Sequence, residues 1–194
     1  MELSVVLYWF DMPLLFEKEG GFTNRKVIEP FVRYCRKCFE LFQDLVDIWY
    51  VYNEPIVDVM SKYLVDKCYP NLCDWNLANN AVYYMIVAHG KVVEAFREGA
   101  FKGKIGSVLN HNVIYPRSQN IGDLKAAQDL GAITQFCFED PLFLGKLNSS
   151  WLQLAKDNGA HIDVLEEDLR CIDANRISLL GLNIYYPTRV KCRE

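Results

Sequence analysis

Four short, mainly apolar runs alternate with longer segments of helical periodicity, and this alternation limits the folds that the chain can adopt. The runs are rich in β-branched and aromatic residues and cover residues 4–10, 46–52, 105–110 and 177–185. We predict that each run is a strand buried on both faces. Strands separated by helices form parallel sheets with right-handed crossovers, so we expect an α/β fold with the strands ordered as in the sequence.

The helices are predicted from apolar residues at helical spacing and from capping residues. The two longest should begin near Asn24 and Asp74, which are typical N-cap residues, and end near residues 42 and 98. Shorter helices are expected over residues 123–138, 150–158 and 166–171. Residues 56–69 fit neither pattern clearly.

Polar side chains end each predicted strand: Asp11, Asn53 with Glu54, Asn110, and Asn183 with Tyr185. In α/β proteins the chemistry lies at the carboxyl ends of parallel strands. We therefore expect these side chains to meet at one rim of the sheet.

Composition argues against several classes of protein. The 194 residues are 51% hydrophobic with a formal net charge of −4, which is typical of a globular domain and lacks the basic surface of nucleic-acid binding. No apolar run approaches the ~18 residues of a membrane span, and the N-terminus lacks the features of a signal peptide. We expect neither nucleic acid nor membrane as a partner.

The seven cysteines are odd in number and scattered, which suits a reducing compartment and predicts a cytoplasmic protein. Cys35 and Cys38 form a CxxC pair within a helical pattern, and we interpret them as helix-core residues rather than a metal or redox site. No glycine-rich loop follows the first run, which argues against a nucleotide cofactor. We predict no cofactor and no metal.

Eight blocks follow one another along the chain: LYWFDMP (7–13), GGFTNR (20–25), YNEP (52–55), CYPNLCDW (68–75), KIGSVLN (104–110), YPRS (115–118), DPLFLGK (140–146) and GLNIYYPTRV (181–190). In this order they resemble glycoside hydrolase family one, which includes β-glucosidases, β-galactosidases and their 6-phospho counterparts. The YPN and YPRS blocks are most similar to the 6-phospho-β-glucosidase branch. The resemblance covers nearly the whole chain.

The resemblance implies a TIM (β/α)₈ barrel, which takes ~250 residues typically and ~200 at least. The matching blocks correspond to barrel strands three to six. We therefore expect one partial-barrel domain over residues 1–194, with about four parallel strands and outer helices. Its two unpaired edges, near residues 4–10 and 177–185, predict a homo-oligomer formed through these edges.

The resemblance also implies that Glu54 is the general acid/base of glycoside cleavage. Such a carboxyl must hold a proton for the leaving oxygen, and an apolar, aromatic setting such as that after Trp49 favours the neutral form. Asn53 would bind the sugar 2-hydroxyl, a contact that strengthens in the transition state. From the residues alone, a solvent-facing or capping carboxylate is the more ordinary interpretation of Glu54.

Four more residues are implied as substrate-binding. Asn110 matches an active-site asparagine, and Tyr185 matches the tyrosine that hydrogen-bonds the nucleophile. Phe10 matches a sugar-facing aromatic, with core packing as the alternative. Trp9 occupies the position of a sugar-binding histidine, although an indole cannot accept a hydrogen bond.

The chain departs from the family in lacking the strand-seven Glu-Asn-Gly that carries the nucleophile. Retaining glycosidases need that second carboxylate ~5–5.5 Å from the first. The implied function is retaining hydrolysis of a β-glycoside or 6-phospho-β-glycoside in carbohydrate metabolism, but we expect the isolated chain to be inactive. The alternatives are a non-catalytic truncated or degenerate fragment that binds or self-associates, and a dimer in which Asp11 or Asp58 of a second copy substitutes for the nucleophile.

Overall fold

A four-stranded parallel sheet organises the molecule. The computed structural model describes residues 1–193, and Glu194, the last residue of the predicted domain, lies outside the described residues. The strands are β1 (Ser4–Tyr8), β2 (Ile48–Asn53), β3 (Lys104–Asn110) and β5 (Leu180–Asn183), in the order β1-β2-β3-β5. The predicted parallel sheet and its strand order are confirmed.

The first and last strands are shorter than predicted. β1 ends at Tyr8 because Phe10 adopts a left-handed backbone (φ 65°) and the Trp9 N–H donates to Asp11 Oδ1 at 3.0 Å instead of continuing the ladder. β5 ends at Asn183, so Tyr185 lies beyond the main sheet. Apolar character continues past both ends, which is why pattern alone overestimates the strands.

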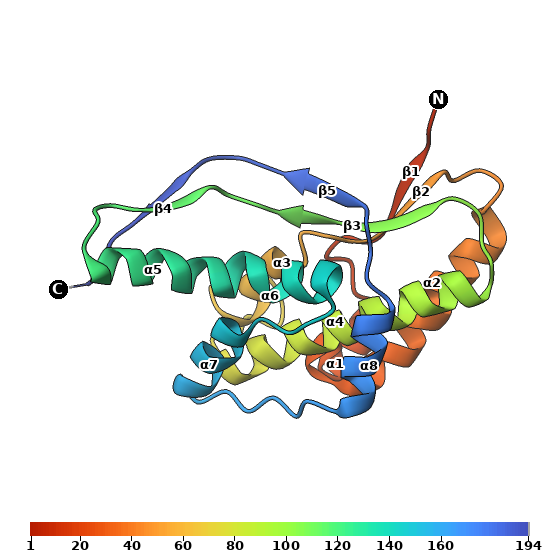
Figure 1. Ribbon diagram of the computed structural model, residues 1–194. Coiled ribbons are helices and arrows are strands. Elements are labelled where there is room, and N and C mark those ends of the chain that lie inside the picture. Colours follow the sequence, from red (N-terminus) through yellow and green to blue (C-terminus); the bar gives the residue numbers. More distant parts are fainter. Residues whose placement is uncertain (194) are drawn as a thin grey trace.

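The helices all lie on one side of the sheet, and the other side carries none of them (Figure 1). They are α1 (Leu14–Lys18), α2 (Ile28–Phe42), α3 (Pro55–Tyr63), α4 (Trp75–Glu98), α5 (Ile121–Gly131), α6 (Cys137–Glu139), α7 (Ser149–Asp157) and α8 (Glu166–Ala174). Asp74 caps α4 as predicted, since its Oδ1 accepts from the Leu77 N–H at 2.9 Å. Asn24 instead caps the short 3-10 turn η2 (Arg25–Val27) that precedes α2, accepting from the Lys26 N–H at 3.1 Å. None of the helices within residues 1–193 combines the length and hydropathy of a membrane span.

Several elements were not predicted. The unassigned segment after Glu54 forms α3, and π-helical turns η3 (Ala132–Phe136) and η4 (Asp140–Leu144) join α5 to α6 and α6 to its following loop. A second parallel pair, β4 (Ile114–Pro116) with β6 (Thr188–Val190), lies beyond the ends of β3 and β5. Three-residue strands are too short to show a periodicity in the sequence.

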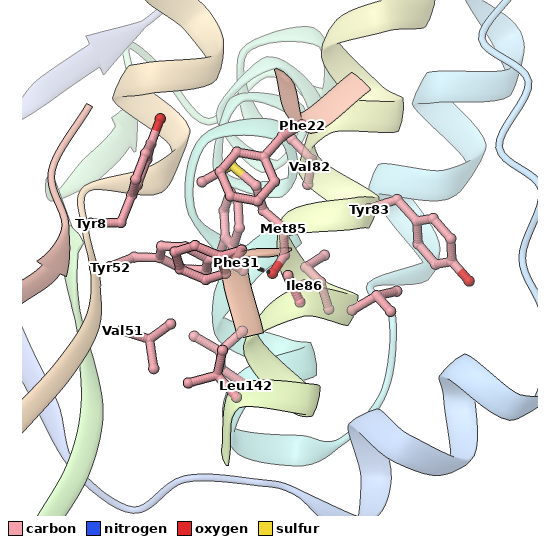
Figure 2. Close-up of a cluster of buried hydrophobic side chains, with 14 of the residues drawn as sticks. Tyr8, Phe22, Phe31, Val51, Tyr52, Val82, Tyr83, Met85, Ile86 and Leu142 are labelled. Carbon is pink, nitrogen blue, oxygen red and sulfur yellow. Dashed lines mark hydrogen bonds between the residues drawn. The ribbon is translucent and has the colours of Figure 1, made fainter. Parts of the chain in front are cut away.

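The core lies between the sheet and α4, and aromatic side chains fill its centre (Figure 2). The Phe31 and Tyr52 rings stack with centroids 5.6 Å apart, while Phe22 meets the Tyr8 ring edge-on at 5.4 Å. The buried Tyr52 hydroxyl donates to the Met85 carbonyl at 3.1 Å. Offset and edge-on aromatic pairs add to the stabilisation from burial, so this packing fixes β1 and β2 against the helices.

Candidate active site

Glu54 occupies the turn between the end of β2 and the start of α3. Its backbone is left-handed (φ 48°), and Pro55 directly begins the helix. The Glu54 N–H donates to the Val108 carbonyl of β3 at 2.8 Å, which ties the turn to the neighbouring strand. A left-handed backbone at a non-glycine residue costs on the order of 1–3 kcal/mol and is retained chiefly at functional sites.

Two neutral donors hold the Glu54 side chain. Asn183 Nδ2 donates to Glu54 Oε1 at 2.8 Å, and the Tyr185 hydroxyl donates to the same oxygen at 2.9 Å. Asn183 Nδ2 also reaches Asn53 Oδ1 at 3.1 Å. The Glu54 carboxylate raises the pKa of the Tyr185 phenol by accepting its proton in a hydrogen bond.

A pocket of about 490 Å³ opens beside this carboxylate. Glu54, Asn110 and Tyr185 all line it, so the structure brings together three of the predicted site residues. The other lining residues come mainly from α3, the segment around β4, and the segment before β6: Ile56, Val57, Met60, Ser61, Val65, Lys67, Asn112, Ile114, Leu130, Thr134, Gln135, Tyr186 and Thr188. The pocket is therefore built where the strands end, as the sequence predicted.

Unpaired amide groups mark the same region. Asn53 is buried and its Nδ2 has no hydrogen-bond partner within residues 1–193, and the same holds for Oδ1 of Asn110 and Oδ1 of Asn112. Buried amide atoms normally have partners, and their absence at one place is typical of a site that binds a polar ligand.

Trp9 and Phe10 do not line this pocket. They follow β1 at the edge of the sheet, where Trp9 is exposed and Phe10 is half-buried outside the hydrophobic core. Their contact with a sugar therefore stays a prediction.

A second carboxylate is missing from the pocket. Within residues 1–193, Glu54 is the one carboxylate among the lining residues, and Glu139, near the same rim, is bound to His111 Nδ1 at 2.6 Å instead. The described residues also contain no group of three or more His, Cys, Asp or Glu side chains that could hold a metal ion.

Asp58, one of the two proposed substitutes for the nucleophile, belongs to a buried ionic group that we call the Lys62 cluster: Tyr8, Glu17, Asp58 and Lys62. Lys62 Nζ lies 3.0 Å from Glu17 Oε2 and 3.2 Å from Asp58 Oδ1, and the Tyr8 hydroxyl donates to Asp58 Oδ2 at 2.7 Å. Asp58 is thereby held inside the protein and cannot enter the site of a second copy.

Asn183 was the main omission of the sequence analysis. It was recognised only as a polar residue at a strand end, although it contacts both Asn53 and Glu54. Its position two residues before Tyr185 was the available indication, because side chains at that spacing lie on one face of an extended chain.

A parallel sheet in sequence order with helices on one side is part of a (β/α)₈ barrel. The family model of glycosyl hydrolase family 1 matches residues 1–194, so the chain belongs to this family.

Its relatives are much longer. The 6-phospho-beta-glucosidase GmuD of Bacillus subtilis (strain 168) is 38% identical over 194 residues, which are 100% of this chain and 42% of that protein. The crystal structure of the AHE enzyme from Alicyclobacillus herbarius matches with a TM-score of 0.93 and 28% identity, covering 100% of this chain and 44% of the other. The beta-glucosidase from Thermotoga maritima in complex with glucoimidazole matches with a TM-score of 0.88 and 30% identity, covering 98% of this chain and 43% of the other.

The chain therefore spans less than half the length of these relatives. The family and the partial barrel predicted from the sequence blocks are both confirmed.

Proposed function

We propose that this chain carries the acid/base part of a retaining β-glycosidase site. The observation that carries the proposal is the strained Glu54 at the end of β2, held by Asn183 and Tyr185 at the edge of the pocket. The substrate is a β-glycoside, and the identity to a 6-phospho-beta-glucosidase favours a sugar phosphorylated at its 6-position.

In this proposal each residue has one task. Glu54, when protonated, gives its proton to the oxygen of the leaving group as the glycosidic bond breaks. Asn53 and Asn110 supply the unpaired amide atoms that bind sugar hydroxyls, and Trp9 and Phe10 extend the sugar-binding surface. Tyr185 matches the family tyrosine that hydrogen-bonds the nucleophile, and in this chain its hydroxyl donates to Glu54 instead.

The reaction also needs a nucleophile to form the glycosyl-enzyme intermediate. The pocket offers no second carboxylate within residues 1–193, so the chain alone should bind a sugar without cleaving it. A non-catalytic binding or self-associating fragment is the alternative function, favoured by this same missing group.

Two further proposals concern the setting. All seven cysteines are free thiols, which supports a cytoplasmic location. The edge strands expose apolar side chains, among them Leu3 beside β1 and Leu180 and Leu182 on β5, which supports self-association through the edges. Light scattering at micromolar concentration tests the latter, and a stable monomer would contradict it.

The activity test compares the purified chain with Glu54→Gln on aryl β-glucosides and their 6-phosphates. We expect both proteins to show the same background hydrolysis, because the covalent step has no nucleophile. Turnover by the parent that disappears in Glu54→Gln would show an active enzyme.

Sugar binding is measured in parallel by ligand-observed NMR with the same compounds. We expect the parent to bind and Asn110→Ala to bind more weakly. If the parent binds neither compound, the glycosidase proposal fails and the non-catalytic alternative replaces it.

A further inference from the structure

We propose that Asn183 is a positioning residue that, together with Tyr185, reserves Oε1 of Glu54 for fixed hydrogen bonds and leaves Oε2 as the oxygen that carries the transferable proton. This inference rests on the proposed acid/base role of Glu54 and assigns that role to one atom.

The orientation of the Asn183 amide follows from its neighbours. The amide atom assigned as Nδ2 lies 2.8 Å from Glu54 Oε1 and 3.1 Å from Asn53 Oδ1, the side-chain amide oxygen. Both of these oxygens accept hydrogen bonds. Only the NH₂ end of the amide can satisfy two acceptors, because an oxygen in its place would face repulsion from both. Asn183 therefore fixes the Glu54 carboxylate and the Asn53 amide with one group.

The backbone places Asn183 before any ligand binds. It is the last residue of β5, paired in register with Asn110 of β3, and its carbonyl accepts from the His111 N–H at 3.1 Å. From this position its side chain reaches residues at the end of β2, a strand that is not its neighbour in the sheet. Asn183 thus links two strands across β3 and holds the strained turn at Glu54.

The two oxygens of Glu54 have different surroundings. Oε1 accepts from Asn183 and Tyr185, whereas Oε2 has no hydrogen-bond partner among residues 1–193. A proton on Oε1 would have to displace one of these donors, so the neutral carboxyl carries its proton on Oε2. When the acid acts, the O–H bond of Oε2 breaks, the proton moves to the leaving oxygen, and the carboxylate that remains keeps both hydrogen bonds.

The two donors are not equivalent. Tyr185 is 64% exposed and follows the end of β5, whereas Asn183 is half-buried within the ladder. Asn183 is therefore the permanent partner of Glu54. The other titratable groups that line the pocket are Lys67, Tyr185 and Tyr186.

The test is a titration of the Glu54 side-chain carboxyl carbon by NMR, in the full chain labelled with ¹³C-glutamate and assigned by comparison with Glu54→Gln. Both donors favour the ionised carboxylate, so Asn183→Ala and Tyr185→Phe should each move the titration midpoint to higher pH, by about one unit or less because the site is partly open to water. Asn183→Asp should move it further than Asn183→Ala, since it places a second negative charge beside Oε1.

Tyr186→Phe is the matched control. Tyr186 lines the same pocket and is equally exposed at 65%, but it makes no hydrogen bond to Glu54, so the midpoint should not move. A purely structural role of Asn183 would change stability and leave the midpoint where it is, and that result would overturn the inference. If Asn183→Ala does not fold, Tyr185→Phe and Asn183→Asp still test the inference. An unchanged midpoint in the variants that fold would overturn it.

The titration needs no substrate. If the chain binds sugars as proposed but the midpoint does not shift in the variants, only this inference fails. If the midpoints shift as expected but no sugar binds, the proposed function fails instead.

Discussion

Two carboxylate sites lie close together, one within α3 and one directly before it, and they are stabilised in different ways. Asp58 and Lys62 lie one turn apart on the helix and form the buried ionic cluster with Glu17 and Tyr8. Glu54, directly before the helix, is held by an amide and a phenol and has no cation within salt-bridge distance among residues 1–193. In the Lys62 cluster the removal of one member changes the balance of buried charges, whereas the partners of Glu54 are neutral and their removal leaves no buried cation unpaired.

The Lys62 cluster has one negative charge in excess, because two carboxylates surround a single ammonium. Burial raises the pKa of Asp58 despite the Coulombic attraction to Lys62 and the hydrogen bond from Tyr8, which act in the opposite direction. A proton retained on Asp58 would bring the group to net neutrality. The cluster is thus a structural device that anchors α3 to α1 and β1.

Removing the cation should give the largest effect. Lys62→Met fills the same space but leaves Glu17 and Asp58 buried without a counter-charge, which should lower the free energy of unfolding by about 3–5 kcal/mol. Urea denaturation at neutral pH measures this change.

Lys125→Met is the matched control, because Lys125 pairs with Asp129 on the surface of α5 at 2.9 Å. Loss of this i,i+4 pair should cost less than about 0.5 kcal/mol. Equal effects of the two substitutions would remove the distinction between the two carboxylate sites.

The pH dependence of stability should reveal Asp58. Because the folded-state pKa of Asp58 lies above its ordinary value of 3.8, the folded protein binds this proton more tightly than the unfolded chain does. The resulting stabilisation is complete below the unfolded pKa and is lost as pH rises through the raised folded pKa, with a slope of up to about 1.4 kcal/mol per pH unit.

Asp58→Asn removes the titrating group and keeps an oxygen that accepts from Tyr8. Its unfolding free energy should therefore decline less than that of the parent over the same pH window, as measured by denaturant titrations at a series of pH values. A parent and a variant with parallel pH profiles would show that Asp58 titrates normally.

The smallest effect concerns the backbone at Glu54. Glu54→Ala and Glu54→Gly both remove the carboxylate, so the difference between them isolates the left-handed conformation. We expect the glycine variant to be more stable by about 1 kcal/mol, because glycine adopts positive φ without steric cost. Thermal and urea unfolding compare the two.

The same pair of substitutions at Gln128, an exposed position within α5, provides the control. In a helix interior glycine should be less stable than alanine by about 1 kcal/mol, so the sign of the difference should reverse. The same sign at both positions would mean that the turn at Glu54 carries no strain.

The sequence predicted the parts of the molecule that depend on local pattern. Apolar runs identified the four strands of the sheet, and Asp74 identified the start of α4. The block around Glu54 placed this residue at the end of β2, where the structure shows it lining the pocket.

The sequence could not predict contacts between distant residues. Glu17 and Lys62 are 45 positions apart, and Asn183 and Glu54 are 129 apart. Which polar groups meet depends on how the strands align and on which neighbours are buried, and neither leaves a periodic pattern. α3 was also left unassigned, because a proline start and a short length give weak helical periodicity.

The interruption between the two parallel ladders has a consequence for how the pocket can change. β3 continues into β4 and β5 into β6 (Figure 1). The two segments pair again where the Thr188 N–H donates to the Val113 carbonyl at 2.8 Å. Asn112, Tyr185 and Tyr186 lie in the unpaired stretches between the ladders, where no strand register fixes them, and they line the pocket. Substitutions in these stretches can therefore change the shape of the pocket while the ladders on either side keep the fold.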